Sequence, residues 1–361
     1  MSAVRDRRFT VVGDMAISQT PSTQLLTALG GGPSIAGVPM TPQLAENLHI
    51  VSTCDRVIRE DLMKCPIKLM RRGPNGTRTP DLNHPVYTIL HDLANPVMTV
   101  AEFKETAQSH VNLWGNHYSE IERDARNNVR ALWPLDPSRM TVDLNGLNQL
   151  RYRYRLADGR LKEWIFDPAN PPIFHIRINA TDGIHGRGPV TVLRDTLGWS
   201  KAAVDASARF FGRGAHPLGA LQTPNKLSPE AAARIRSDWE RLHGGVENFH
   251  RVAVLDHDVK WQAIGLSQKD VEFLATMKFQ QSLLAGYFRV AAHLVNDLEK
   301  ATFSNIEHLQ ISHVGNCLMP HFVRWQQAIA RDLLNPRSFN THFAVFKIDG
   351  GEDPRMWEVL K

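Results

Sequence analysis

The stretch Ser304–Leu334 reads SNIEHLQISHVGNCLMPHFVRWQQAIARDLL. Its first four residues match a capping box, in which the Ser and Glu side chains would satisfy backbone amides of the first helical turn. From Ile311 to Leu333, apolar residues recur every three or four positions, which predicts a helical stripe about 33 Å long at ~1.5 Å per residue. Pro320 removes a backbone hydrogen bond inside this stripe. The sequence therefore predicts one long kinked helix or two abutting helices.

A second long helix is predicted upstream, from Ser267 to Val290. Ser267 suits the N-cap position, and Asp270 is favourable at the positive end of the helix. One side of this helix is apolar, and the other carries small and polar residues that would let a second helix approach closely, within a core or in another copy of the chain. Between the two helices, Ala291–Thr302 has no apolar period, and we expect an exposed loop. The small and polar side comprises Ala275, Lys278, Ser282, Gly286 and Arg289.

Composition sets broad limits on the class of protein. The chain has 361 residues and 42% hydrophobic content, with no apolar run near the ~18 residues of a membrane span and no signal-peptide pattern. We therefore expect a soluble protein, cytoplasmic when made, with a sizeable core. The net charge of +5 is spread along the chain without a run of five like charges, which does not favour tight, sequence-reading nucleic-acid binding. The three cysteines match no metal-ligand spacing and are expected to be reduced thiols.

Upstream of residue 185 the pattern indicates an α+β domain, because strands follow strands without intervening helices. Residues 1–40 are rich in Ser, Thr, Gly and Ala and are expected to form a flexible arm. A helical pattern covers Thr41–Arg72 and gives way to a strand that begins at Cys65. A second helix is predicted after a capping box at Thr99-Val-Ala-Glu102. Glycines in Gly183–Gly188 predict a flexible joint. The later strands are expected at Tyr118–Arg123, Val129–Leu135, Met140–Val142, Leu150–Leu156 and Ile173–Ile178.

A helix is predicted over Pro189–Phe211, and a small module follows it up to about residue 265. Pro217–Gln222 resembles a strand, and Ser228-Pro-Glu230 matches a helix start with Pro at the first helical position. Arg251–Leu255 and Val259–Ile264 are expected to pair as a hairpin. The module would thus lie between two helices, as if carried on a two-helix stalk.

Candidate chemistry is sparse. No phosphate-binding loop, dinucleotide fingerprint or nucleophile elbow occurs, so no catalytic residue, cofactor or metal is expected. Asp256-His-Asp258 would make a poor metal site, because adjacent hairpin residues point to opposite faces. The glycines of 183–188 could bind an anion, although a joint before a helix is the simpler interpretation. The histidines His308, His313 and His321 do not share a metal-binding face and are expected at the surface or in an interface, and Trp199, Trp239, Trp261 and Trp325 suit subunit packing or a core equally well.

Many short motifs occur in one order along residues 51–349, and together they resemble the portal proteins of tailed bacteriophages, specifically the HK97-like portal family. No single motif is decisive, but the shared order makes the resemblance specific. The stretches that carry it are Cys54-Asp-Arg-Val-Ile-Arg-Glu-Asp-Leu, Pro66-Ile-Lys-Leu, His84-Pro-Val-Tyr, Asn95-Pro, Gly115-Asn-His-Tyr-Ser-Glu-Ile-Glu, Phe174-His-Ile-Arg, Asp182-Gly, Phe210-Phe-Gly-Arg-Gly-Ala-His-Pro-Leu-Gly, Gly245-Val-Glu-Asn, Val254-Leu, Asp270–Phe273 and Thr302-Phe-Ser-Asn-Ile-Glu.

The resemblance implies an α+β portal fold in a ring, usually of twelve copies, at one capsid vertex. Such a ring would conduct double-stranded DNA during packaging by the terminase large subunit and during ejection, and would contact a head–tail adaptor and the major capsid protein. It implies a protein of the virion, present in the host cytoplasm during assembly, in a phage or a gene-transfer agent. The implied parts are a wing at 41–185, stem helices at 186–215 and 267–290, a clip at 216–266, a tunnel loop at 291–303, a long kinked helix at 304–334 and a C-terminal wing strand with a reduced or absent crown at 335–361.

The resemblance also assigns candidate contact residues. A channel that passes DNA of any sequence should not grip phosphates, because each neutralised phosphate adds affinity through counterion release. A loop carrying two acidic residues beside one lysine fits that requirement. Arg289-Val-Ala-Ala292 stands where relatives commonly have Val-Pro-Pro, which leaves the start of the loop open. The candidates are Asn296, Asp297, Glu299 and Lys300 in the tunnel loop, Lys226, Arg234, Arg236, Asp238 and Arg241 in the clip, and Lys278, Ser282 and Arg289 in the stem.

Two other classes of function stay open at this point. One is a metal-dependent nucleic-acid-processing enzyme that uses the turn at Asp256–Asp258. The other is a monomeric adaptor or scaffold, which the two long helices with interface-like sides disfavour.

Overall fold

The structure is a computed structural model that describes residues 34–73, 76–212, 219–222, 228–231, 233–234, 237, 260–263, 268–296, 303–334 and 338–348. The chain divides into two compact units, one formed by residues 1–202 with 280–361 and the other by residues 203–279. Helices α7 (Arg194–Gly212) and α9 (Gln268–Phe288) each run from one unit into the other.

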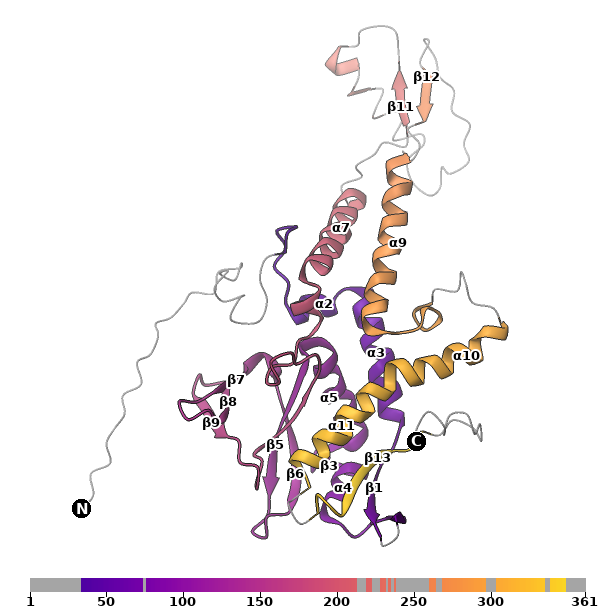
Figure 1. The fold of residues 1–361 in the computed structure, drawn as a ribbon. Helices are drawn as coiled ribbons and strands as arrows, with labels where there is room; N and C mark the ends of the chain where they lie inside the picture. Colours follow the sequence, from indigo (N-terminus) through magenta and orange to yellow (C-terminus); the bar gives the residue numbers. More distant parts are fainter. Residues whose placement is uncertain are drawn as a thin grey trace, which may run out of the picture. The chain divides into compact units, whose positions relative to one another are not determined.

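The larger unit is an α+β structure in which helices lie beside small antiparallel sheets (Figure 1). Its helices include α2 (Pro42–Glu46), α3 (His49–Lys64), α4 (Pro85–His91), α5 (Val100–Trp114) and α6 (Pro189–Val192). The first sheet has the strand order β13-β1-β2 (His342–Phe346, Ile67–Arg72, Arg78–Pro80). The second has the order β10-β5-β6 (Ile173–Arg177, Asn116–Arg123, Val129–Leu135), and β3 (Leu93–Asn95) pairs separately with β4 (Met98–Thr99). The third has the order β7-β8-β9 (Met140–Leu144, Leu150–Arg155, Leu161–Ile165).

Several local predictions are confirmed. Both halves of the Thr99 capping box form, since the Glu102 amide donates to Thr99 Oγ1 at 3.3 Å and the Thr99 amide donates to Glu102 Oε2 at 2.8 Å. Gly115 ends α5 in the left-handed conformation at φ 78°, which costs glycine little. Strand β6 covers the expected residues, whereas β9 was missed because its short alternation has little local signal.

The long C-terminal helix forms as expected but without a sharp break. Helix α10 (Phe303–His313) passes through a π-helical turn, η5 (Val314–Leu318), into α11 (Met319–Asp332). Pro320 directly follows this π-helical turn, and the wide turn accommodates its ring inside the continuous helix. Because α10 begins at Phe303, Ser304 lies inside the helix, so its assignment as the N-cap residue is wrong by at least one position.

The core of the larger unit is centred on α11. Trp325 is 1% exposed, and its ring lies 6.1 Å from the Phe103 ring and 6.0 Å from the Phe174 ring. Phe322 stacks on Phe346 of β13 at 4.6 Å. For Trp325, therefore, core packing is the correct one of the two sequence interpretations, while Trp239 and the side chain of Trp261 lie outside the described residues.

The expectation of a flexible joint at Gly183–Gly188 is wrong. The Gly186 amide donates to Asn116 Oδ1 at 2.8 Å, and Asn116 Nδ2 donates back to the Gly186 carbonyl at 2.8 Å. A Cβ at Gly186 would overlap the carbonyl of Gly115, and one at Gly188 would lie 2.5 Å from the carbonyl of Leu113. The glycines allow two backbone segments to approach closely, so the segment is clamped rather than loose.

In the smaller unit, β11 (Gly219–Gln222) pairs antiparallel with β12 (Lys260–Ala263). The described partner of β12 is therefore β11, and Arg251–Leu255, its expected hairpin partner, lies outside the described residues. Ser228 acts as expected at a helix start, because its Oγ accepts a hydrogen bond from the Ala231 amide at 3.3 Å.

Candidate functional site

The C-terminal end of α9 anchors the segment where the tunnel loop was predicted. The Arg289 amide donates to the Gly286 carbonyl at 3.1 Å, and the Val290 amide donates to the Ala285 carbonyl at 3.2 Å. This pair of bonds is a Schellman motif, with Arg289 in the left-handed conformation at φ 56°. The end is held further by Cys317, whose Sγ donates to the Phe288 carbonyl at 3.4 Å. Arg289 thus occupies the helix-end position that glycine usually holds, and its side chain is exposed.

The exposed-loop prediction for residues 291–302 is wrong for its first half. Ala292–Val295 forms a 3₁₀ turn, η4, and Leu294 and Val295 pack partly buried against the core. Asn296 ends this turn, exposed and with a left-handed backbone at φ 64°. The remaining tunnel-loop candidates, Asp297, Glu299 and Lys300, lie outside the described residues.

The predicted apolar side of α9 is confirmed where it enters the larger unit. Leu284 is 1% exposed and Phe288 is 8% exposed, and both belong to the core. The stem candidates Lys278 and Ser282 have exposed side chains on the other side of the helix, as does Arg289 at its end. Of the clip candidates, Arg234 is exposed, while Lys226, Arg236, Asp238 and Arg241 lie outside the described residues.

A buried chain of polar side chains, which no local sequence pattern indicated, joins α11 to α5 and α3. Trp325 Nε1 donates to Gln108 Oε1 at 2.9 Å. Because an indole can only donate, the amide oxygen of Gln108 must face it, and Gln108 Nε2 donates to His321 Nδ1 at 2.9 Å and to Asn112 Oδ1 at 2.7 Å. Asn112 Nδ2 in turn donates to Asp55 Oδ1 at 2.9 Å. Each donor in the chain therefore has a defined acceptor, which fixes the register of α11 against α5.

Two histidines of the long helix are buried, which corrects the expectation that they lie at the surface or in an interface. His321 is 7% exposed and accepts from Gln108. His313 is 6% exposed, and its Nε2 lies 3.2 Å from Asp61 Oδ2 on α3. His308 is exposed as expected.

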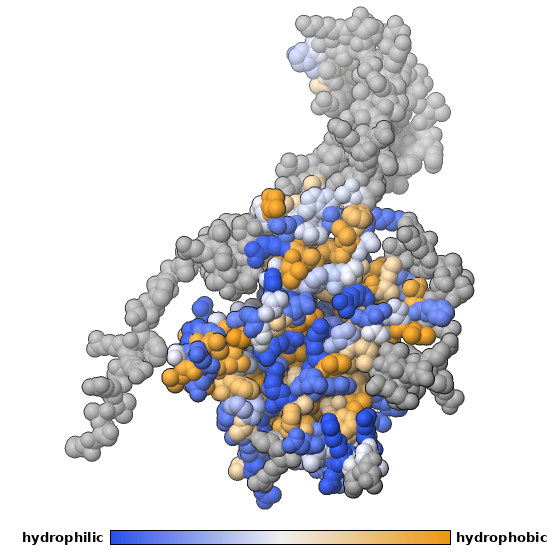
Figure 2. Space-filling model, in the orientation of Figure 1, coloured by the Kyte–Doolittle hydropathy of each residue, from blue (hydrophilic) through white to orange (hydrophobic). Residues whose placement is uncertain are grey.

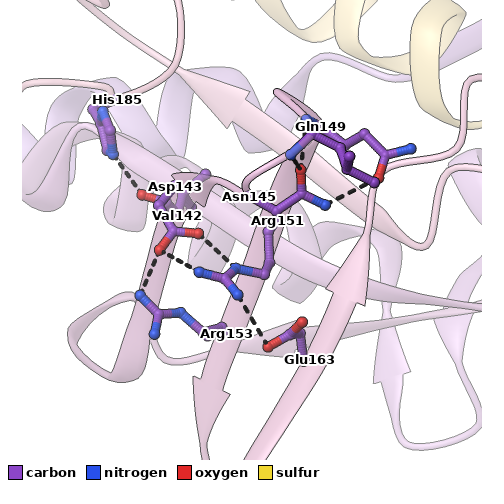
Figure 3. A network of polar contacts seen from close by, with 9 residues as sticks. Val142, Asp143, Asn145, Gln149, Arg151, Arg153, Glu163 and His185 are labelled. Atoms are coloured by element: carbon purple, nitrogen blue, oxygen red, sulfur yellow. Dashed lines mark hydrogen bonds and ion pairs between the residues drawn. The ribbon is translucent and has the colours of Figure 1, made fainter.

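The β7-β8-β9 sheet presents a different kind of surface, with a network of charges on its outer face (Figure 3). Asp143 accepts from Arg151 Nε at 2.8 Å and from Arg153 at 2.5 Å, and Arg151 also lies 3.8 Å from Glu163. Hydrogen bonding from Arg151 lowers the pKa of Asp143 from its usual value. Because this network holds long charged side chains of all three strands in place, the outer face presents an ordered set of charged groups.

Large apolar side chains are exposed around that network. Figure 2 shows hydrophobic residues over this sheet, on a face of the molecule where hydrophilic and hydrophobic residues are otherwise interspersed. Apolar groups that cluster in the open on one small sheet are typical of a contact surface. On the face that carries Asp143, the exposed fractions are 60% for Leu161 and 46% for Ile165. Leu144, 48% exposed, lies on the opposite face, and Leu147, 79% exposed, lies in the turn between β7 and β8.

Comparison with known proteins identifies the family. The family model described as phage portal protein matches residues 49–354. The chain belongs to the phage portal protein family. It is 30% identical over 289 residues to the portal protein of Enterobacteria phage HK97, a match that covers 79% of this chain and 66% of the relative, so the chain spans about two thirds of that relative's length.

The fold of this portal chain is also similar to that of solved structures. A chain in the neck of an empty gene-transfer-agent particle, computed with C6 symmetry, matches with a TM-score of 0.67 and 22% identity, covering 94% of this chain and 87% of that one. A chain in the neck of a native particle, computed with C12 symmetry, matches with a TM-score of 0.64 and 23% identity, covering 84% and 81%. The α+β portal fold expected from the sequence is thereby confirmed.

Portal proteins are structural components of particles and not enzymes, which agrees with the lack of a catalytic motif in the sequence. The residues of the proposed enzymatic turn, Asp256–Asp258, lie outside the described residues. Within the part of the chain that the structure describes, no three His, Cys, Asp or Glu side chains are grouped as metal ligands, and no helix is long and apolar enough to cross a membrane.

The buried histidines of this portal chain predict a loss of stability in mild acid. Burial lowers the pKa of His321 to about 3 and holds those of His117 and His175 well below their usual value. Below about pH 6.5 these histidines bind protons in the unfolded chain but not in the folded chain. The stability that they contribute is therefore fully present above that pH, and the free energy of unfolding decreases as the pH falls through it. We expect unfolding monitored by circular dichroism to show a decrease of about 1 kcal/mol per buried histidine between pH 7 and pH 5.5.

The matched control for the acid effect is His321→Gln. This variant removes one of the titrating rings, so its stability should fall less steeply between pH 7 and pH 5.5 than that of the unaltered chain. A stability that does not change over this range would contradict the neutral, buried state of these histidines.

Proposed function

We propose that this chain forms a ring, of twelve copies, in the neck of a phage or gene-transfer-agent particle, and that double-stranded DNA passes through the ring during packaging and ejection. The family match over residues 49–354 carries the proposal. The C6 and C12 symmetries of the similar particle necks support it, because a ring of twelve is compatible with both. The terminase large subunit, a head–tail adaptor and the major capsid protein are the proposed partners, and the residues of the smaller unit are the proposed contacts of the first two.

The proposed channel contact is the segment that follows η4. Asn296, exposed at the end of this anchored turn, would begin a loop whose next charged residues are Asp297, Glu299 and Lys300. A net negative loop repels phosphates, so DNA would slide past it without being held by released counterions. The folded turn before Asn296 provides a firm base for the loop, which suits a narrow passage.

The proposed contact between neighbouring copies includes the outer face of the β7-β8-β9 sheet. A ring needs a heterologous contact, in which one surface of each copy meets a different surface of the next. The ordered charges around Asp143 would fix the orientation, and the exposed Leu161 and Ile165 on the same face would provide apolar area.

Leu161→Glu combined with Ile165→Glu tests this contact. The double variant would desolvate two carboxylates at every contact between neighbouring copies. We therefore expect at least a tenfold loss of assembled rings, which corresponds to about 1.4 kcal/mol, and a loss of DNA-filled particles. Size-exclusion chromatography with light scattering measures the first, and the yield of nuclease-resistant DNA from purified particles measures the second.

The matched control is Leu82→Glu, because Leu82 is 62% exposed and Leu161 is 60% exposed, but Leu82 belongs to another part of the unit. The control should assemble and package normally. Unchanged rings in the double variant would contradict the contact surface, whereas a chain absent from purified particles would contradict the proposed function itself.

A further inference from the structure

Residues 178–188, which join β10 to α6, reach the edge of the β7-β8-β9 sheet through the ring of His185 (Figure 3). His185 Nε2 lies 2.7 Å from the carbonyl oxygen of Val142 on β7, and His185 Nδ1 lies 2.7 Å from Asp182 Oδ2. The amides of Ile184 and His185 both donate to Asp182 Oδ1 at 2.8 Å. The ring is therefore held between a fixed carboxylate of its own segment and a strand of the sheet.

Both groups that contact the His185 ring are acceptors. A backbone carbonyl cannot donate, and hydrogen bonds from the amide and ring of His185 hold the pKa of Asp182 well below its usual value, so Asp182 is a carboxylate. A neutral imidazole carries one N–H and can donate to only one of the two acceptors, whereas an imidazolium carries two and can donate to both. Two contacts of 2.7 Å thus fit a doubly protonated ring.

The charges around the ring favour the same state. Burial alone would lower the pKa of His185, but hydrogen bonding to Asp182 and Val142, together with the nearby Asp143 carboxylate, outweighs burial and raises that pKa above its usual value. Other titratable and charged groups of this region are Arg151 and Arg153 on β8, which both pair with Asp143, Arg177 on β10, which donates to the Ile184 carbonyl at 3.3 Å, and His175 on β10, which burial keeps neutral.

The β7-β8-β9 sheet packs on the rest of the larger unit through a small apolar cluster of its own. Val142 and Tyr152 of the sheet meet Tyr118 of β5 and Ile173 of β10 in this cluster, which is separate from the main core around α11. Where few apolar side chains hold an element, the polar contacts at its margin carry a larger share of its attachment. The contact from His185 to Val142 is such a contact, and histidine is the side chain that gains or loses a proton near neutral pH.

We propose that His185 is a proton-dependent latch, which holds β7 against the segment before α6 while the ring is doubly protonated and releases β7 when the ring loses a proton to water. The proton lost is the one on Nε2. Asp182 is fixed by two amides and carries a negative charge, which makes it the stronger acceptor, so the neutral ring keeps its N–H on the carboxylate. The lone pair of Nε2 then faces the Val142 oxygen, and because two acceptors repel each other this contact opens.

The latch responds to pH in the direction opposite to that of the buried histidines. Because the pKa of His185 is higher in the folded chain, its contribution to stability is fully present below the unfolded value of about 6.5 and is lost as the pH rises through the folded value. The buried histidines act below about pH 6.5, so the two effects occupy separate pH ranges. The latched sheet carries the proposed contact between neighbouring copies. That consequence for assembly rests on the proposed function, whereas the latch itself is a property of one chain.

Amide hydrogen exchange of the full chain, read by mass spectrometry of peptides that cover β7, tests the latch. His185→Ala removes the ring, so at about pH 6 we expect β7 to exchange about two- to fivefold faster than in the unaltered chain, as for the loss of one partly exposed hydrogen bond. At about pH 9 the unaltered chain has released β7, so the two chains should exchange alike. Comparison of the two chains at the same pH cancels the intrinsic effect of pH on exchange.

Asp182→Asn separates the protonation of the ring from its mere presence. The introduced amide oxygen can still accept from the amides of Ile184 and His185, while the introduced NH₂ group donates to His185 Nδ1. A neutral ring in this variant carries its proton on Nε2 and donates it to Val142. We therefore expect β7 to exchange slowly at both pH values, although the ring is uncharged at the higher one.

His91→Ala is the matched control, because His91 forms an exposed pair with Asp92 at 2.9 Å in another part of the unit. It should leave the exchange of β7 unchanged at both pH values. A ratio of exchange rates between His185→Ala and the unaltered chain that stays the same from about pH 6 to about pH 9 would overturn the proposal, as would fast exchange of β7 in Asp182→Asn. None of these outcomes depends on ring formation or on DNA passage.

Discussion

Gln108→Leu is expected to lower the free energy of unfolding by about 3–5 kcal/mol, because it leaves buried polar groups without their partners. Gln108 is fully buried and hydrogen-bonds Trp325, His321 and Asn112. Leucine has a similar volume, so the loss would come from the unpaired indole, imidazole and amide rather than from a cavity. Denaturant unfolding monitored by tryptophan fluorescence measures the change.

The control for this variant is Gln149→Leu. Gln149 is exposed and takes part in one side-chain hydrogen bond, with Asn145 at 2.9 Å. Its replacement should change stability by less than about 0.5 kcal/mol. If the two variants lost the same amount, the polar chain between α11 and α5 would not be what holds these helices in register.

Gly186→Ala is expected to cost at least about 3 kcal/mol, since its Cβ would occupy the space of the Gly115 carbonyl. Relief would require β5 and the segment before α6 to separate, which would break the paired hydrogen bonds between Gly186 and Asn116. The variant should unfold at a lower denaturant concentration and should expose the backbone around residue 186 to proteolysis.

Gly146→Ala is the matched control, because a Cβ there would meet no atom within 4 Å and its backbone is not in the left-handed region. Its effect should stay within about 0.5 kcal/mol. Similar stabilities for the two alanine variants would contradict the close approach of the two backbone segments.

Much of the fold could be predicted because its signals are local. The Thr99 capping box, the stripe of α11 and the apolar side of α9 each depend on residues within a few turns of one another. A proline in the first turn of α11 is also readable from the sequence, although the wide π-helical turn before it is not, because several backbone arrangements can accommodate the ring.

What could not be predicted depends on contacts between distant segments. The glycines near residue 186 read as a joint, since the sequence does not show that Gly115 lies against them. The burial of His321 depends on Gln108, which is 213 residues away. The end of α9 was misjudged for a different reason, because Arg289 adopts the left-handed conformation that glycine usually supplies.

The candidate site was predictable only in part. The sequence placed polar groups after α9, but the 3₁₀ turn that anchors Asn296 depends on packing of Leu294 and Val295 against the core. The outer face of the β7-β8-β9 sheet was not singled out, because β9 was missed and its register with β8 brings Glu163 beside Arg151 and Arg153. The boundaries of the wing, stem, clip and tunnel loop stay predictions.

Electron microscopy of the purified full chain is the most direct test of the central claim, that identical copies of this chain surround a passage for DNA. We predict closed rings of twelve copies with a central opening wide enough for a DNA duplex. Native mass spectrometry of the same sample should give twelve times the chain mass of 40.6 kDa. Particles that are only monomers or two-fold dimers, with no opening at any protein concentration, would contradict the account.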